Sequence, residues 1–562
     1  MRKKWEYKDI DEEKVKKIQD KFKVSNLLAT VLVNREIVSE KDIEVFLNPT
    51  RNDFHDPYLM PDMEVAVNRI VKAIEKHEKV IIYGDYDVDG ITSITVLKKF
   101  LKTCGLDAGY YIPNRLNEGY GLNKNAIDKI HEEGYTLIIT VDCGISGIEE
   151  IEYANSLGLE TIVTDHHEPM DILPPAIAVI DLKRKDNDKY PFNSLAGCGV
   201  VFKLTQALGM KLGLDEKEYL KYLDIVCVGT ISDIVPLIDE NRVIAKLGLK
   251  LVEVTKNPGL RALLNASGYK QVNSNTISFG IAPRINACGR MGCEEEALKL
   301  FLTDNIEEAE KITDELNQFN RERQEIEKNI FDEAIRMIEK EDKDNNAIVL
   351  GSQNWHHGVI GIVSSKITEI YYKPSILICF EGDKGKGSGR SIPGFDLHEA
   401  LVNLSKHLDK YGGHEMAVGL SLDKKNFNRF KEDFNKYVND KDISDLVPIL
   451  DIDKQIEMKD VDSEIVKELD VLEPFGEANR KPVFVYKNLK IDSIRALSDG
   501  KHLKLTLKDG NILINAIGFN MGALSKEYTI GDKVDIAGML EINSFNGRDF
   551  VQINMRDIMK SL

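Results

Sequence analysis

Three aspartates occur at alternate positions directly after a short apolar run. The run at residues 80–84 is typical of a buried strand, and Asp85, Asp87 and Asp89 follow it before Gly90. If the backbone stays extended, side chains two residues apart point the same way, so the three carboxylates would share one face. Carboxylates that lie close together repel one another unless a cation lies between them. The spacing therefore predicts a cation site.

An EF-hand calcium loop is the alternative with the most similar spacing. It also begins with alternating acidic residues and has a glycine at its sixth position, but its twelfth residue is a glutamate. The twelfth residue here is Val96, which excludes the EF-hand. Residues 91–101 have the pattern of an amphipathic helix. A strand, an acidic turn and a helix form the layout of sites at the carboxyl edge of a parallel sheet.

The chain repeats this arrangement, because other apolar segments also end in an acidic residue or a histidine. Asp142 follows residues 137–141, Asp165, His166 and His167 follow residues 161–164, Asp181 follows residues 176–180, and residues 224–230 lead into Ser232 and Asp233. Strands that alternate with helical segments predict a parallel sheet, whose functional crevice lies at the carboxyl ends of the strands. We therefore expect these side chains to meet at one edge of the sheet.

The candidate ligands are oxygen and imidazole donors without a set of thiolates. They are Asp85, Asp87, Asp89, Asp142, His166 and Asp233. Such donors favour Mn²⁺ or Mg²⁺ over structural zinc, and the imidazole favours Mn²⁺. A single ion that keeps water does not need so many ligands, so we expect two ions roughly 3.5–4 Å apart with Asp142 between them. The pattern leaves open whether Asp85 contacts an ion directly.

A centre of this kind is suited to phosphoryl transfer. Two ions would lower the pKa of a shared water towards neutrality and stabilise the oxyanion that leaves. If His166 is a ligand, its neighbour His167 is free to contact a substrate phosphate or to assist the leaving group. Asp142 and His167 are therefore the candidate catalytic residues.

Length, net charge and composition limit the class of protein to which this chain can belong. A chain of 562 residues is too long for one core and should form roughly three or four domains. Its net charge of −18 argues against coating by nucleic acid, so any such binding must be confined to patches. Seven cysteines without a repeating spacing are typical of a reducing cytosol. Residues 1–6 are mostly charged and lack the apolar run of a secretory signal, and no apolar run of about 18 residues occurs elsewhere, so we expect a cytoplasmic protein without a membrane span or a secretory signal.

We predict an α/β protein with a β-barrel at its end. The expected parts are an N-terminal helical subdomain at residues 1–75, a parallel-sheet domain at 76–304, a connecting helix at 305–341, a second α/β domain at 342–447 and a barrel at 448–562. The connecting helix is predicted because Ile312, Leu316 and Ile330 follow helical spacing over a very charged background. A helix so long and polar usually bridges domains.

Glycine-rich basic segments occur in the second α/β domain. Glycine alternates with lysine, serine and arginine at residues 384–391, and Gly412, Gly413 and His414 follow. We expect turns here, because turns that expose backbone N–H groups beside cations suit phosphate. A flexible hairpin turn without a ligand is the alternative.

From about residue 448 the sequence alternates with the period of strands. Asp-Gly and Asn-Gly pairs at 499–500, 509–510 and 546–547 predict the hairpin turns of a small β-barrel. The first half of this region is basic through Arg480, Lys481, Lys487, Lys490, Arg495, Lys501, His502, Lys504 and Lys508. Against the acidic background this asymmetry favours a nucleic-acid groove, with a solvated barrel face as the alternative.

Taken together, these motifs resemble a known family. Residues 85–90, 142–144, 165–167 and 232–233 are similar to successive motifs of the DHH phosphoesterases. Residues 283–290, 388–391 and 412–419 resemble those of its RecJ branch of exonucleases, and the resemblance covers nearly the whole chain. One difference is Asp181, because the family pattern leads us to expect Asn-Pro after the fourth strand.

The resemblance implies a metal-dependent 5′→3′ exonuclease that hydrolyses single-stranded DNA in DNA repair and recombination. It implies the same metal ligands, a catalytic His167 and a barrel similar to an OB-fold. The substrate contacts that it implies are Arg115, Arg284, Asn286, Arg290, Ser388, Gly389, Arg390 and His414. Single-stranded DNA is the expected partner, together with a helicase or a single-strand-binding protein.

Two alternatives differ in class. A DHH phosphodiesterase for short oligonucleotides or cyclic dinucleotides would have no need of a basic barrel, so the barrel favours the exonuclease. A single-strand-binding protein with a relic site is disfavoured because every candidate ligand is intact.

Overall fold

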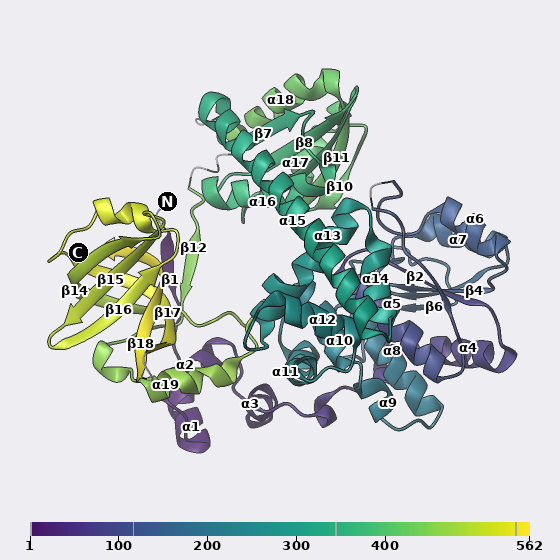
Figure 1. Cartoon of the computed structure of the whole chain (residues 1–562), viewed down its shortest axis with the longest axis horizontal. Coiled ribbons are helices and arrows are strands. Elements are labelled where there is room, and N and C mark those ends of the chain that lie inside the picture. Colours follow the sequence, from purple (N-terminus) through teal and green to yellow (C-terminus); the bar gives the residue numbers. More distant parts are fainter. Residues whose placement is uncertain are drawn as a thin grey trace. The chain divides into compact units, whose positions relative to one another are not determined.

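The computed structural model describes residues 3–115, 117–342, 345–441, 443, 445–545 and 548–561 (Figure 1). The chain divides into two compact units, each built from separated stretches. Residues 57–233 and 251–448 form one, the α/β unit, and residues 1–56, 234–250 and 449–562 form the other, the barrel unit.

A five-stranded parallel sheet forms the first part of the α/β unit. Its strands lie in the order β3 (Gly109–Tyr111), β2 (Val80–Gly84), β4 (Leu137–Val141), β5 (Glu160–Thr164) and β6 (Ala178–Ile180). β2 and β4 are buried along their whole length, as expected for central strands of a parallel sheet. The predicted parallel sheet is confirmed, with the short strand β3 in addition.

Helices connect these strands and extend the unit. They are α4 (Met63–Lys76), α5 (Val88–Thr103), α6 (Lys124–Glu132), α7 (Ile148–Ser156), α8 (Gly197–Lys211), α9 (Lys217–Leu220) and α10 (Leu223–Ser232). The apolar segment before Asp233 is thus helix α10 and not a strand of the sheet. It is buried from Leu223 to Ile231, and a segment apolar on all sides has no periodicity that separates helix from strand.

The long helix predicted at residues 305–341 is α15 (Ile306–Met337), followed by a π-helical turn at Ile338–Asp342. Its first part packs against α12 (Pro258–Ser267), α13 (Ala282–Met291) and α14 (Glu294–Leu302), and it also packs against α16 (His357–Tyr371). Ile312, Leu316 and Ile330 are buried, as the helical spacing predicts. The helix therefore contacts both α/β parts of this unit (Figure 1).

A second sheet forms the other part of the unit. Its order is β10 (Lys410–His414), β11 (Ala417–Asp423), β9 (Lys384–Arg390), β8 (Ser375–Glu381) and β7 (Ile348–Ser352). β7 and β8 are parallel, and the other neighbours are antiparallel. Helices α16, α17 (Leu397–Asn403) and α18 (Phe427–Asp440) complete this part.

The glycine-rich segments expected to form turns are strands β9 and β10. In β9, Gly385, Gly387 and Gly389 alternate on the packed face of the sheet. A Cβ at these positions would lie 2.8 or 2.9 Å from the nearest neighbouring side-chain atom. Ser388 and Arg390 lie on the opposite face because strand side chains alternate. Close packing of the sheet therefore explains the glycines, and a turn does not.

In the barrel unit, β1 (Lys4–Tyr7) pairs in parallel with β12 (Ile449–Ile452), and α1 (Glu12–Phe22), α2 (Asn26–Asn34) and α3 (Glu40–Leu47) follow β1. The unit is tied together by Arg242 of α11 (Asp239–Glu253). Its buried guanidinium donates to the carbonyl oxygens of Phe46, Val471, Leu472 and Glu473 at 2.7–3.3 Å. One side chain thus joins all three stretches of the unit.

The barrel consists of β14 (Phe484–Leu497), β15 (His502–Asp509), β16 (Ile512–Gly518), β18 (Arg548–Lys560) and β17 (Lys533–Phe545), in that order. Pairing of β14 with β17 closes the ring, so the predicted barrel is confirmed. The turns predicted at residues 499–500 and 509–510 connect β14 to β15 and β15 to β16. The turn predicted at Asn546-Gly547 lies outside the described residues.

All seven cysteines are free thiols. No helix in the described part of the chain is both long and apolar enough to cross a membrane.

Candidate active site

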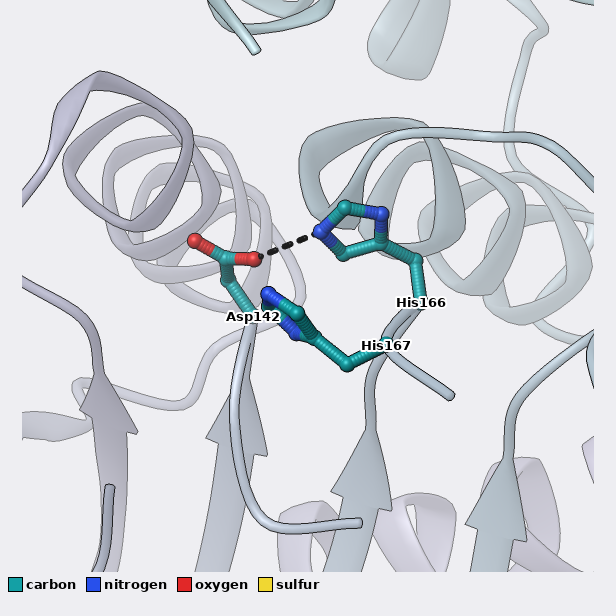
Figure 2. Close-up of side chains that lie close together, drawn as sticks. All are labelled: Asp142, His166 and His167. Atoms are coloured by element: carbon teal, nitrogen blue, oxygen red, sulfur yellow. Dashed lines mark ion pairs between the residues drawn. The ribbon is translucent and has the colours of Figure 1, made fainter. Parts of the chain in front are cut away.

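The predicted acidic and histidine residues meet at the carboxyl end of the parallel sheet. The chain leaves β2 first towards β3 on one side and then towards β4 on the other. Such a topological switch point opens a crevice beyond the strand ends. Figure 2 shows Asp142, His166 and His167 just beyond the ends of adjacent strands.

The ligand atoms of these residues form three overlapping groups, in each of which the atoms lie within 4.8 Å of one another. The groups are Asp85, Asp87 and Asp142; Asp142, His166 and His167; and Asp89, His166 and Asp233. All six predicted metal ligands belong to at least one group. Asp142 and His166 each belong to two, so they lie between the others.

Asp85, Asp87 and Asp89 do not share one face of an extended strand, contrary to the prediction. β2 ends at Gly84, and α5 begins at Val88, three residues earlier than expected. Asp87 causes this early start because its Oδ1 accepts hydrogen bonds from the backbone N–H groups of Asp89 (2.9 Å) and Gly90 (3.1 Å). Asp89 therefore lies in the first helical turn and joins a different group.

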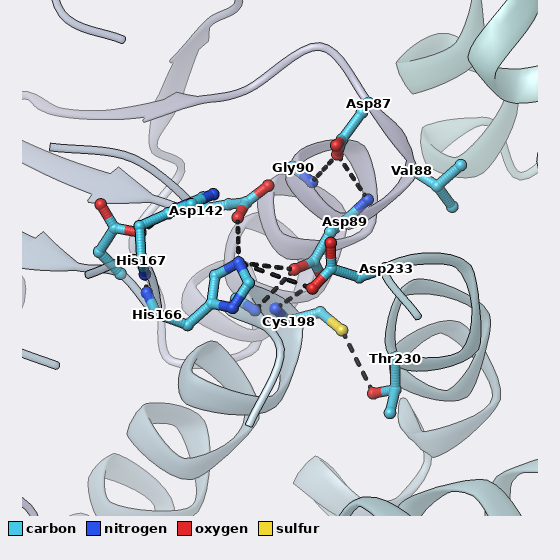
Figure 3. A network of polar contacts seen from close by, with 12 residues as sticks. Asp87, Val88, Asp89, Gly90, Asp142, His166, His167, Cys198, Thr230 and Asp233 are labelled. Atoms are coloured by element: carbon cyan, nitrogen blue, oxygen red, sulfur yellow. Dashed lines mark hydrogen bonds and ion pairs between the residues drawn. The ribbon is translucent and has the colours of Figure 1, made fainter. Parts of the chain in front are cut away.

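His166 lies at the centre of the cluster (Figure 3). Its Nε2 is 3.1 Å from Asp142 Oδ1, 3.7 Å from Asp233 Oδ2 and 3.8 Å from Asp89 Oδ2. Three carboxylates from separate parts of the chain thus converge on one ring nitrogen.

Polar atoms at the buried centre of the acidic cluster lack hydrogen-bond partners. In the described part of the chain, Asp85 Oδ1, Asp142 Oδ1 and His166 Nε2 are buried without a hydrogen-bond partner, which is rare for buried polar atoms. Burial and repulsion between the carboxylates raise the pKa of Asp85 and Asp142, and that of Asp233 to about 8. Burial lowers the pKa of His166 to about 4, so the ring is neutral at pH 7. Divalent cations such as Mn²⁺ or Mg²⁺ fit this donor set because they supply charge and partners together.

Asp89 is held by the N-terminus of α8. Its two carboxylate oxygens accept hydrogen bonds from the backbone N–H groups of Gly197 (2.6 Å) and Cys198 (2.8 Å) (Figure 3). The positive end of the helix dipole favours a carboxylate at this position. A Cβ on Gly197 would lie 2.8 Å from Asp142, and one on Gly229 would lie 3.0 Å from Asp89 Oδ1. Both glycines therefore let helices approach the candidate ligands closely.

His167 is oriented by the fully buried Asp165. Asp165 Oδ2 accepts the backbone N–H of Ile145 at 2.9 Å, and its Oδ1 lies 2.7 Å from His167 Nδ1. Burial alone would lower the pKa of His167, but the hydrogen bond and negative charge of Asp165 raise it to about 9. The ring is therefore protonated at pH 7, and with 45 % of its side chain exposed it can donate to a substrate.

Asp181, the residue that differs from the family pattern, is buried at the end of β6. Its Oδ1 accepts the backbone N–H of Lys183 at 2.8 Å, and burial raises its pKa to about 7. It belongs to none of the three groups of ligand atoms.

A second cluster is positive and contains three of the predicted substrate contacts. The guanidinium of Arg115 lies 4.9 Å from the ring centre of Tyr86, the residue between Asp85 and Asp87. Arg290 donates from Nη1 to the carbonyl oxygen of Gly358 at 3.0 Å. Burial, and then the charges of Arg115, Arg323 and Arg390, lower its pKa to about 10.

Arg390 completes this arginine cluster. Its Nη1 donates to Ser388 Oγ at 3.2 Å and to the carbonyl oxygen of Gly389 at 2.8 Å. Burial and the charge of Arg115 lower its pKa. Arg115, Arg290 and Arg390 form no ion pair with a carboxylate within the described ranges, so an anion would relieve their mutual repulsion.

The other predicted substrate contacts lie in different surroundings. Arg284 donates to Asn317 Oδ1 at 2.6 Å and to the carbonyl oxygens of Ala266 and Gly280, so it holds neighbouring helices together. Asn286 lies half-buried on α13, and His414 lies on the exposed strand β10.

Several residues of the site were not identified from the sequence as functional. Asp165 is part of the Asp-His-His triplet, which was the available signal. Gly197 is the first residue of an apolar helix and lies within Ala-Gly-Cys-Gly. This run of small residues indicates close packing but does not identify the neighbouring segment. Tyr120, whose hydroxyl lies 3.1 Å from His167 Nδ1, had no distinguishing signal.

Three family models match separate parts of the chain. They are the DHH family, N-terminal domain, at residues 79–230, the DHHA1 domain at 344–440 and the RecJ OB domain at 452–557. The candidate metal ligands up to His166 lie within the first match, and Asp233 lies three residues beyond it.

Known proteins are similar to the chain over most of its length. The single-stranded-DNA-specific exonuclease RecJ of Bacillus subtilis is 38 % identical over 98 % of this chain and 70 % of the relative. A crystal structure of RecJ from Thermus thermophilus in complex with Mn²⁺ has a TM-score of 0.87 at 30 % identity, covering 100 % of this chain and 80 % of the other. A structure of RecJ from the same organism with Mg²⁺ has a TM-score of 0.82 at 29 % identity, covering 100 % and 79 %.

Proposed function

Because this chain belongs to the RecJ family of single-stranded-DNA-specific exonucleases, we propose that it hydrolyses single-stranded DNA from its 5′ end with two divalent cations. We further propose that this activity serves DNA repair and recombination. The seven free thiols support a cytoplasmic location.

One observation carries the proposal: the arginine cluster adjoins the acidic cluster. Arg115 stacks on Tyr86, and the residues on both sides of Tyr86 are candidate metal ligands. A phosphate held by the arginines would therefore lie next to the ligand groups. One guanidinium group can donate two parallel hydrogen bonds to two oxygens of the same phosphate, which suits a terminal phosphate.

Asp85, Asp87, Asp89, Asp142, His166 and Asp233 would hold the ions. Bound there, two divalent cations would lower the pKa of a water and offset the charge that develops on the leaving oxygen. We favour Mn²⁺ because the set includes an imidazole. Metal-bound structures of relatives contain Mn²⁺ or Mg²⁺.

The remaining residues of the site orient the substrate and move the proton. Asp165 keeps His167 protonated at Nδ1, so the ring can donate a hydrogen bond or a proton from Nε2 to the leaving oxygen. Arg115, Arg290, Ser388 and Arg390 would hold the terminal phosphate while the next phosphodiester reaches the acidic cluster. A hold on the 5′ phosphate sets the direction of degradation.

The barrel carries basic side chains that suit single-stranded DNA. In the pairing of β14 with β15, Lys490 lies opposite Lys508 and Arg495 lies opposite Lys504. These four side chains are exposed, and none forms an ion pair with a carboxylate where the structure describes the chain. Like charges directly opposite one another destabilise a sheet, so a bound phosphate backbone would be favourable here. Since the enzyme would act on single strands, we propose a helicase or a single-strand-binding protein as its partner.

Removal of divalent cations is expected to abolish hydrolysis of single-stranded DNA. EDTA would leave the buried carboxylates without the charge that the reaction needs, and Mn²⁺ should restore more activity than Mg²⁺. The measurement is the release of label from 5′- and 3′-labelled single strands and from blunt duplexes. Loss of the 5′ label first from single strands supports the proposal. Duplex cleavage at the same rate, products from the 3′ end, or activity in EDTA would contradict it.

Arg390→Ala is expected to lower cleavage of 5′-phosphorylated single strands by roughly 10- to 100-fold, because charge-assisted hydrogen bonds contribute about 1.5–3 kcal/mol. Cleavage of 5′-hydroxyl strands should change much less, since these lack the terminal phosphate. Arg336→Ala, which removes an exposed arginine of α15, is the matched control and should leave both rates unchanged. If Arg390→Ala and the parent show the same ratio of the cleavage rate on 5′-phosphorylated strands to the rate on 5′-hydroxyl strands, Arg390 does not hold the end phosphate.

A further inference from the structure

The loop between β3 and α6 contacts both clusters of the site. It carries Arg115 near its start and Tyr120 five residues later. Arg115 stacks on Tyr86, whereas Tyr120 lies against His167. A single short loop therefore contributes to the arginine cluster and also contacts the proposed proton donor.

Tyr120 makes two polar contacts through its hydroxyl. The oxygen lies 3.1 Å from His167 Nδ1 and donates to the backbone carbonyl oxygen of Asp142 at 3.3 Å. The carbonyl of Asp142 can only accept, so the tyrosine O–H is the donor in that contact. The tyrosine oxygen can then accept a hydrogen bond from His167 Nδ1–H, which also donates to Asp165. The tyrosine ring meets the His167 ring edge-on at 5.5 Å. Tyr120 thus fixes the orientation of the imidazole relative to Asp142.

The loop is braced by hydrogen bonds along its length. Glu118 accepts hydrogen bonds from the hydroxyl of Tyr111 (2.8 Å), the backbone N–H of Asn114 (2.8 Å) and the side chain of Asn123 (3.2 Å). The hydroxyl of Tyr83 donates to the carbonyl oxygen of Gly121 at 2.9 Å. A shift of Arg115 would therefore be transmitted to Tyr120 through a bonded turn.

We infer that Tyr120 is a positioning residue that couples recognition of the end phosphate to the orientation of His167. This inference rests on the proposed function, in which Arg115 contacts the 5′ phosphate and His167 assists the leaving oxygen. The Tyr120 hydroxyl already contacts His167 and Asp142, and phosphate on Arg115 holds the loop in this arrangement. The end phosphate then raises the rate of the chemical step and not only the affinity for the strand.

The test compares parent and Tyr120→Phe on the same strand with a 5′ phosphate and with a 5′ hydroxyl. Single-turnover rates with saturating enzyme and Mn²⁺ report the chemical step, and fluorescence anisotropy in EDTA reports affinity. We expect about a tenfold lower rate on the phosphorylated strand, the effect of losing one hydrogen bond to a charged group, a smaller loss on the hydroxyl strand and unchanged affinity for both. Tyr153→Phe removes a hydroxyl that bonds Asp128 on the outside of the sheet and should match the parent.

A second variant tests the loop without touching either cluster. Glu118→Ala removes the brace. Like Tyr120→Phe, it should lower the ratio of the single-turnover rate on the 5′-phosphorylated strand to the rate on the 5′-hydroxyl strand. Thermal unfolding of each variant distinguishes this effect from loss of the fold.

Three results would overturn the coupling. They are equal losses on both strands, no loss on either strand, or a loss that appears only as weaker binding. Inactivity of the parent on any single strand would instead refute the proposed function, and the inference with it.

Discussion

Asp142→Asn is expected to lower the rate of single-strand hydrolysis by about a thousandfold or more. Asp142 belongs to two of the three groups of ligand atoms and is fully buried between them. Replacing its carboxylate by an amide removes a charge that both ions would share. Metal ions supply several kcal/mol of transition-state stabilisation, and about 4 kcal/mol corresponds to a thousandfold change in rate.

Asparagine is a better test than alanine because of the backbone at this position. Asp142 has a φ of 58°, in the left-handed region that asparagine and aspartate tolerate better than other side chains. Asparagine therefore removes the charge with little added strain. Single-turnover rates in Mn²⁺ and in Mg²⁺ measure the effect, with circular dichroism as the check on the fold.

Stability gives a second readout that does not depend on activity. The raised pKa values of Asp85, Asp142 and Asp233 arise from burial and from repulsion within the cluster, so loss of one charge should stabilise the metal-free protein. Stabilisation by added Mn²⁺ should become smaller, because a ligand that binds only the folded state stabilises it less when it binds more weakly. A variant that is stabilised by Mn²⁺ as much as the parent, or that remains active, would remove Asp142 from the set of ligands.

The residue types and their order along the chain were enough to predict that the acidic and histidine side chains meet at one edge of the parallel sheet. Asp142 and His166 follow apolar segments that are true strands, and parallel strands end at one edge of a sheet. That rule brings distant residues together without knowledge of their packing. It worked for these residues because the buried strands β4 and β5 have a clear apolar signal.

Asp89 and Asp233 show where this reasoning stops. Both were predicted as ligands, yet Asp89 lies on a helical turn and Asp233 follows a helix. The side chain of Asp87 decides where α5 begins, and the sequence does not say whether an aspartate will cap a helix or stay free. In strand β9 the glycines were taken for turn residues, although bulky neighbours on adjacent strands require them. A local hydrogen bond of Asp87 decides the first case, and contacts between distant segments decide the case of the glycines.

Gly197 is the residue of the site whose role depends most on such a distant contact. Its N–H bonds Asp89, and its missing side chain leaves room for Asp142, which lies 55 residues earlier in the chain. A Cβ there would lie 2.8 Å from both Cβ and Oδ1 of Asp142. Contacts between Cβ atoms and neighbouring atoms are longer than this in real proteins. Because the left-handed backbone conformation also restricts Asp142, neither Asp142 nor α8 can move freely to relieve the contact.

Gly197→Ala is therefore expected to displace two candidate ligands, Asp89 and Asp142, and to lower the hydrolysis rate by about a hundredfold or more, the cost of misplacing reacting groups by about 1 Å. Overpacking should also destabilise the fold by roughly 1–3 kcal/mol. Gly199→Ala in the same helix is the matched control, because its Cβ would approach Leu195 and no candidate ligand, and no closer than 3.3 Å. If the two variants cleave single strands equally fast and gain the same stability from Mn²⁺, the close approach of α8 to Asp142 does not position the ligands.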